Sequence, residues 1–108
     1  MHRFLVVVAL AGCVPTSYAY TPASSRTFEK RTEGCEFEVT TTPPTKDYEE
    51  VGQLAHYNGD VPQNLDKFKA AVAKQVCSLG GDGVIAISSV GKGYDKGTIF
   101  HYPRPFTP

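Results

Sequence analysis

Three cysteines, at positions 13, 35 and 77, have the most defined chemistry in this chain of 108 residues. Cys13 ends the sequence Leu-Ala-Gly-Cys, which follows the basic Arg3 and the apolar run Phe4–Ala11. A basic start, a short apolar run and small residues before the cut are typical of an export signal. The four residues at positions 10–13, Leu-Ala-Gly-Cys, match the lipobox of bacterial lipoproteins, in which the cysteine thiol receives the lipid. Residues 1–12 are therefore predicted to be a lipoprotein signal peptide, and Cys13 the lipidation site.

The apolar run is too short to be a membrane span, since about twenty apolar residues are needed to cross the hydrocarbon core. Ordinary secretion is the alternative, because Ser17-Tyr18-Ala19 also has small residues where a signal peptidase would cut after Ala19. Val14 stands where an aspartate would favour retention at the inner membrane. In a Gram-negative host we therefore expect a lipid anchor in the outer membrane, with the protein facing the periplasm.

Lipidation of Cys13 would leave Cys35 and Cys77 as a pair in an oxidising compartment, where disulfides persist. A bond between them would be worth roughly 3–4 kcal/mol. At 100° per residue, Cys77 lies about 140° from the centre of the apolar stripe of its helix, so it is predicted to point away from the sheet. The bridge then needs the chain near Cys35 to pass the helix end. A free thiol and an intermolecular bond are the alternatives.

His56 and His101 are weak candidates for a metal site, together with Cys77 or Asp60. Zinc sites usually contain closely spaced pairs of ligands, and the chain has none, so half-exposed strand histidines are the preferred interpretation. No cofactor is expected. The chain also lacks a nucleophile motif such as G-x-S-x-G, and we therefore expect a protein that is not an enzyme.

Charge argues against nucleic-acid binding. Removal of Arg3 with the signal leaves ten Lys and Arg against eleven Asp and Glu, a net charge of −1, with no basic stripe for a phosphate backbone. A protein partner is the remaining expectation. A set of four tyrosines is a weak candidate for its aromatic contact surface: Tyr48, Tyr57, Tyr94 and Tyr102.

The elements that position these residues follow from hydrophobic periodicity. The polar composition of residues 13–33 predicts a flexible tether. A small domain is expected over residues 34–103, followed by a tail at 104–108. Strands are expected over 35–42, 49–57, 84–87 and 98–102, with 84–87 in the centre of the sheet. One helix is predicted from an apolar stripe that a glycine at 80 or 81 ends: Leu65, Phe68, Val72, Val76 and Leu79. The predicted fold is α+β, a two-layer sandwich of one amphipathic helix on a four-stranded sheet in the order β-β-α-β-β.

Residues 40–89 resemble a superfamily of small bacterial domains. The matching segments are Thr-Thr-Pro-Pro, then Tyr-Glu-Glu-Val-Gly-Gln-Leu at 48–54, and Leu-Gly-Gly-Asp-Gly-Val-Ile at 79–85. The superfamily includes the YbjQ-like proteins and the RcsF-type outer-membrane stress-sensor lipoproteins. RcsF-type proteins carry four cysteines in their domain and a long proline-rich stalk, whereas this chain has two domain cysteines and no such stalk. The YbjQ-like resemblance allows a ring-like homo-oligomer.

The expected function is that of a lipid-anchored envelope lipoprotein with a non-catalytic protein-interaction or sensor-type domain. The alternative is an envelope protein that binds a metal or a small ligand through His56 and His101.

Overall fold

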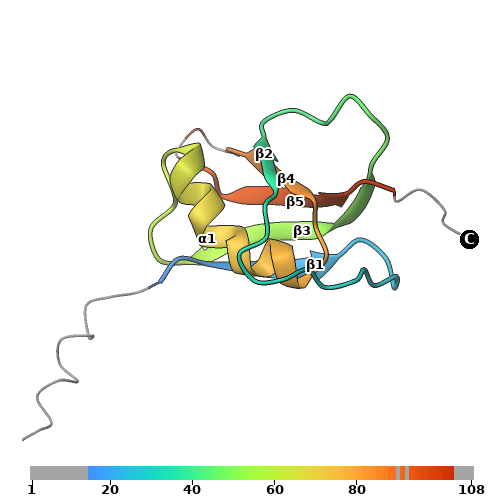
Figure 1. Cartoon of the computed structure of the whole chain (residues 1–108). Coiled ribbons are helices and arrows are strands. Elements are labelled where there is room, and N and C mark those ends of the chain that lie inside the picture. Colours follow the sequence, from blue (N-terminus) through green and yellow to red (C-terminus); the bar gives the residue numbers. More distant parts are fainter. Residues whose placement is uncertain (1–14, 90, 92, 104–108) are drawn as a thin grey trace, which may run out of the picture.

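The computed structural model describes residues 15–89, 91 and 93–103 (Figure 1). The predicted signal peptide at 1–12, the lipidation site Cys13 and the predicted tail at 104–108 lie outside these residues. The elements, in chain order, are β1 (Ser17–Pro22), β2 (Glu38–Thr40), β3 (Glu49–Asn58), α1 (Leu65–Ser78), β4 (Gly83–Ile87) and β5 (Lys96–His101).

The strands form one five-stranded mixed sheet in the order β1-β3-β5-β4-β2. The pairs β1–β3, β3–β5 and β4–β5 are antiparallel, whereas the short β2 runs parallel to β4 at one edge. A bulge between Glu50 and Gly52 interrupts the register of β3 against β5. The inner strands β3, β5 and β4 are adjacent to one another, with β1 and β2 at the two edges of the sheet.

The expectation of a four-stranded sheet in the order β-β-α-β-β is therefore wrong. The fifth strand, β1, comes from residues 17–22, which the polar composition of residues 13–33 had assigned to a tether. The side chain of Tyr18 belongs to the core and is only 4% exposed. Tyr20 packs against the same core. Two tyrosines among serine, threonine and proline are a weak apolar signal, although their spacing of two is that of a strand.

Two details of the sheet also differ from the expectation. The centre of the sheet is β5 rather than residues 84–87, because β1 and β3 add to its far side. The first predicted strand, over 35–42, is shorter in the structure and covers Glu38–Thr40. The disulfide at Cys35 and a turn bond from the Cys35 N–H to the Thr32 carbonyl hold the preceding chain out of the sheet.

The helix predicted from the apolar stripe is confirmed as α1. The Asn64 side chain caps its N-terminus by accepting from the Lys67 N–H at 2.8 Å, which satisfies one of the free amides of the first turn. Phe68, Val72 and Val76 are buried against the sheet. Gly80 takes the left-handed conformation (φ 81°) that ends the helix. At 14 residues, α1 is too short and too polar to cross a membrane, and the described residues contain no other helix.

The main core lies between α1 and one face of the sheet, where Leu54, Val84 and Ile99 meet the buried stripe of the helix. The chain leading into β2 crosses the other side of α1 (Figure 1) and buries Phe37 and Cys77 there. The helix is therefore covered on two sides, which gives this small domain a larger core than a helix lying on a sheet would have.

The opposite face of the sheet carries a second, smaller apolar group around Phe100, whose side chain is 0% exposed. Strand alternation places Phe100 on this face, because its neighbour Ile99 belongs to the core under α1. The rings of Tyr48 and Tyr102 pack edge-on against Phe100, with centroids 5.7 and 5.3 Å away. Residues 41–48 thus lie over the sheet at the end where β5 finishes.

Candidate functional site

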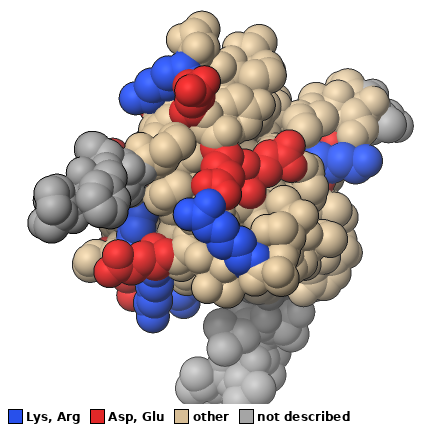
Figure 2. All heavy atoms as spheres, turned by 90° about the vertical axis from the view of Figure 1, so that its right-hand side faces the viewer, with Lys and Arg blue, Asp and Glu red and all other residues tan. Residues whose placement is uncertain are grey.

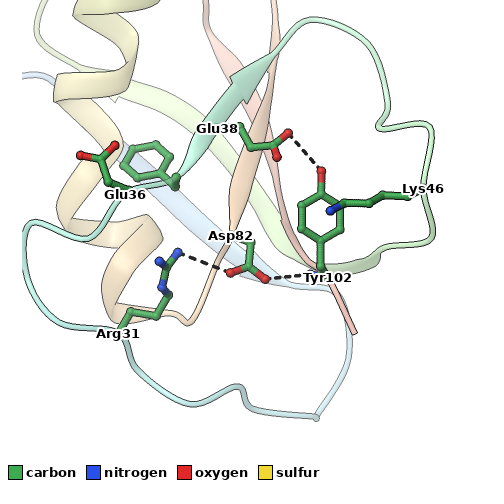
Figure 3. Close-up of a pocket in the computed structure, with 7 residues that line it drawn as sticks. Arg31, Glu36, Glu38, Lys46, Asp82 and Tyr102 are labelled. Atoms are coloured by element: carbon green, nitrogen blue, oxygen red, sulfur yellow. Dashed lines mark hydrogen bonds and ion pairs between the residues drawn. The ribbon is translucent and has the colours of Figure 1, made fainter. Parts of the chain in front are cut away.

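A polar hollow lies at the end of the sheet where β5 finishes and β2 and β4 begin. We use "polar hollow" for the surface lined by Arg31, Glu36, Phe37, Glu38, Lys46, Asp82 and Tyr102. Figure 2 looks onto this end of the molecule and shows acidic and basic side chains next to one another near its centre. In Figure 3, the Asp82 side chain lies between Arg31 and Tyr102.

Asp82 is placed by the end of α1. The Gly80 N–H donates to the Cys77 carbonyl and the Gly81 N–H to the Val76 carbonyl, so the chain turns sharply after the helix and enters β4. The Asp82 N–H then donates to the Phe100 carbonyl at 2.8 Å. This backbone leaves the Asp82 side chain 12% exposed at the base of the hollow.

The Asp82 carboxylate holds together three parts of the chain. Its Oδ2 accepts from the Tyr102 N–H at 2.8 Å and lies 3.4 Å from the His101 Nδ1. Its Oδ1 lies 3.4 Å from the Arg31 Nη1. Because hydrogen bonds to an ionised group are stronger than neutral ones, Asp82 fixes the end of β5 and the segment around Arg31 relative to the helix end.

Arg31 contributes both its backbone and its side chain. Its N–H donates to the Cys77 carbonyl at 2.8 Å, and its Nη1 donates to the Gly81 carbonyl at the same distance. Carbonyls at a helix C-terminus lack partners within the helix and carry partial negative charge, so a guanidinium is well placed there. Arg31 thus forms one wall of the hollow while it closes the end of α1.

Tyr102, Glu38 and Lys46 form the opposite wall. The Tyr102 hydroxyl donates to the Glu38 Oε1 at 3.0 Å, and the Lys46 Nζ lies 4.0 Å from the centre of the Tyr102 ring. Burial raises the pKa of Tyr102, and the hydrogen bond to Glu38 and the charges of Glu38 and Asp82 raise it further. At neutral pH the hydroxyl is therefore protonated and serves as a donor.

The lining of the hollow carries charges of both signs. Its lining has two cations, Arg31 and Lys46, and three carboxylates, which leaves a net charge of −1. The Glu36 side chain is 95% exposed. The single hydroxyl in the lining belongs to Tyr102, whose raised pKa makes it a poor nucleophile at neutral pH. The arrangement fits a cationic group that approaches Glu36 and Glu38 and stacks beside an aromatic ring.

The predicted disulfide between Cys35 and Cys77 is confirmed. The chain before β2 passes the end of α1, as the bridge requires, and the Arg31 N–H bond to Cys77 helps to hold it there. Cys77 is buried, with a side chain 1% exposed, because this segment covers the side of α1 that turns away from the sheet. The bridge therefore positions the Arg31 wall of the polar hollow.

The two histidines that could hold a metal are not brought together. They lie on adjacent strands, but His101 pairs with Glu49 at one end of β3, and His56 is seven residues further along that strand. At about 3.3 Å per residue this separates them by roughly 20 Å. Within residues 15–89, 91 and 93–103, no three His, Cys, Asp or Glu side chains are grouped closely enough to hold a metal ion.

The four tyrosines expected to form one surface are split between the two ends of the sheet. Tyr48 and Tyr102 contact Phe100 beside the hollow. Tyr94 packs on Phe68 at the opposite end, where Tyr57 also lies.

Arg31 and Lys46 were not predicted as site residues, since both stand in segments without hydrophobic periodicity. The alternation of residues 35–42 predicts that Glu36 and Glu38 lie on one side of the strand. This alternation was the one sequence signal for these two residues of the hollow.

No family model, curated protein or solved structure matches this chain at a significant level.

Proposed function

We propose that this protein is a lipid-anchored lipoprotein of the cell envelope whose domain binds a partner protein without catalysing a reaction. The position of β1 supports the anchor. A signal peptidase that cut after Ala19 would remove half of this strand, including the buried Tyr18, which packs edge-on against Phe68 at 5.7 Å. A cut before Cys13 leaves the whole sheet in the mature protein, and this observation carries the proposal.

The outer membrane, with the domain on its periplasmic side, is the proposed location. The basis is Val14 after the lipobox cysteine, together with a disulfide that suits an oxidising compartment. The resemblance of residues 40–89 to RcsF-type and YbjQ-like domains stays a prediction.

The proposed binding site is the polar hollow, and the partner is expected to present a basic segment to it. Glu36 and Glu38 are exposed, while Asp82 is held by groups within the domain. The contact of Lys46 with the Tyr102 ring supports this proposal, because an aromatic face attracts cations. Complementary charge mainly sets the rate and specificity of association, so a weak, salt-sensitive complex is expected.

The anchor is tested by mass spectrometry of the protein purified from membranes of a Gram-negative host. We expect a mature chain that begins at Cys13 and carries acyl chains, while Cys13→Ala retains its signal segment. An unmodified mature chain that begins at Tyr20 would contradict the anchor.

The binding site is tested by a photo-crosslinking amino acid at position 36, matched with the same group at the exposed Ala70 on α1. We expect a discrete adduct from position 36 in intact cells, weakened by Glu38→Lys and absent from position 70. Identical adducts from both positions would contradict a specific site at the hollow.

A further inference from the structure

The start of β1 is fastened to the turn that follows β3. The Thr16 Oγ1 donates to the Asp60 carbonyl at 2.9 Å, and Ser17 pairs with Asn58 in the sheet. Gly59 has a φ of 80°, and a Cβ added to it would lie 2.8 Å from the Pro15 carbonyl oxygen. Pro15 and Thr16 are therefore packed against this turn.

Cys13 is separated from Pro15 by a single residue. A chain spans at most about 3.6 Å per residue, so the Cα atoms of Cys13 and Pro15 are no more than roughly 7 Å apart. A lipid on Cys13 therefore has no long tether between it and the sheet. The end of the domain formed by Pro15–Ser17 and Tyr57–Val61, here called the anchor-proximal end, must lie close to the bilayer.

The surface of this end suits an interface between lipid and water. Tyr57 is 67% exposed, and it is the one large hydrophobic side chain that is exposed among the residues described. Tyrosine places its ring among lipid headgroups while its hydroxyl stays hydrated, which makes it common at membrane interfaces. Lys67 and Lys96 are exposed nearby, but three carboxylates accompany these two cations: Asp60, Asp66 and Asp95. Attraction to anionic lipid is therefore a minor contribution.

We propose that the anchor-proximal end rests directly on the phospholipid headgroups, with Tyr57 inserted at the interface. This inference rests on the proposed lipid at Cys13. The polar hollow lies at the other end of β3, whose ten residues span about 30 Å. The domain consequently stands on the bilayer with the hollow turned away from it, where a partner protein has access.

The absence of tryptophan from the sequence provides the test. Tyr57→Trp and the control Thr45→Trp, in the loop beside the hollow, each introduce a single tryptophan at an exposed position. The lipidated proteins are reconstituted into vesicles of phosphatidylethanolamine and phosphatidylglycerol with brominated acyl chains. We expect a blue shift and a loss of fluorescence for Trp at position 57, and neither change at position 45. The shift should persist at high salt.

A flexible Gly-Ser segment inserted between Val14 and Pro15 gives the matched comparison. It should abolish the quenching at position 57 while the protein still floats with the vesicles. Flotation without quenching in the protein lacking the insertion would overturn the inference and leave the anchor standing. Failure of the unmodified protein to acquire lipid and float would overturn the proposed anchor, and this inference with it.

Discussion

Cys35 and Cys77 are joined by a disulfide that ties the chain before β2 to the last turn of α1. Cys77 is buried on the side of the helix that turns away from the main apolar stripe. The bridge therefore fastens the segment that carries Arg31 across the outside of the helix, and it stabilises one wall of the polar hollow as well as the fold.

The double variant Cys35→Ala/Cys77→Ala should be less stable than the oxidised wild type. The bridge closes a loop with a sequence separation of 42 residues, for which the chain-entropy model gives about 4 kcal/mol. We expect the free energy of unfolding, measured with urea, to fall by about 3–4 kcal/mol. The wild type in reductant should behave like the double variant. A variant as stable as the oxidised wild type would show that the bridge does not hold the segment in place.

The parts of the fold that could be predicted from the sequence are those with strong local signals. The helix follows from a stripe with the spacing of Phe68, Val72 and Val76, and the disulfide from the number of cysteines and the expected compartment. Strand β1 gave a weaker signal, because it lies at an edge and buries little beyond Tyr18 and Tyr20. Its assignment depends on pairing with β3, whose paired residues lie 30 to 41 positions further along the chain.

The polar hollow could not be predicted for a related reason. Arg31 and Glu38 precede Asp82 by 51 and 44 residues in the sequence, and neither of the two stands in a motif. Their association depends on the path of the chain across α1 and on the parallel pairing of β2 with β4. Neither feature follows from periodicity, since a period of two identifies a strand without naming its neighbour.

Asp82→Asn should destabilise the domain without unfolding it. The amide oxygen can still accept from the Tyr102 N–H, but the attraction to Arg31 is lost. Since hydrogen bonds to charged groups contribute about 1.5–3 kcal/mol, we expect a loss of about 1–2 kcal/mol in urea unfolding. Asp47→Asn, in the exposed loop, is the control and should change the stability by less than about 0.5 kcal/mol. If the two substitutions lowered the free energy of unfolding equally, Asp82 would not have the structural role described above.

Tyr18→Phe should change how stability depends on alkaline pH. Burial, and to a smaller extent the charge of Asp95, raise the pKa of Tyr18 from an ordinary value of 10.0 to about 12. As the pH rises, the Tyr18 hydroxyl therefore loses its proton in the unfolded chain before it does so in the folded protein. The stabilising effect of neutral Tyr18 is complete below pH 10 and is lost as the pH rises toward 12. The hydroxyl also donates to the Tyr94 carbonyl at 2.7 Å, so the wild type should be about 1 kcal/mol more stable at pH 8.

The advantage of the wild type over Tyr18→Phe should then shrink between pH 10 and 12, as measured by urea unfolding at matched pH values. The pKa values of Tyr20 and Tyr102 are also raised, by burial first, but both residues are present in the two proteins and cancel in the difference. A difference that stays constant up to pH 12 would mean that Tyr18 ionises alike in the folded and unfolded chains.

Gly83→Ala should be costly because of Phe100, on the face of the sheet away from α1. An added Cβ at Gly83 would overlap the end of the Phe100 ring, and overpacking of this kind costs about 1–3 kcal/mol. Phe100→Leu removes the overlapping ring atoms, so the double variant should lose less stability than the sum of the two single losses. Gly81→Ala is the matched control, since its Cβ would meet Ile99 and Val76 instead, and its loss should add to that of Phe100→Leu. The expected result is that the stability losses fail to add for Gly83→Ala with Phe100→Leu, and add for Gly81→Ala with Phe100→Leu. This result would place the Phe100 ring over β4, where it supports the Tyr102 wall of the polar hollow.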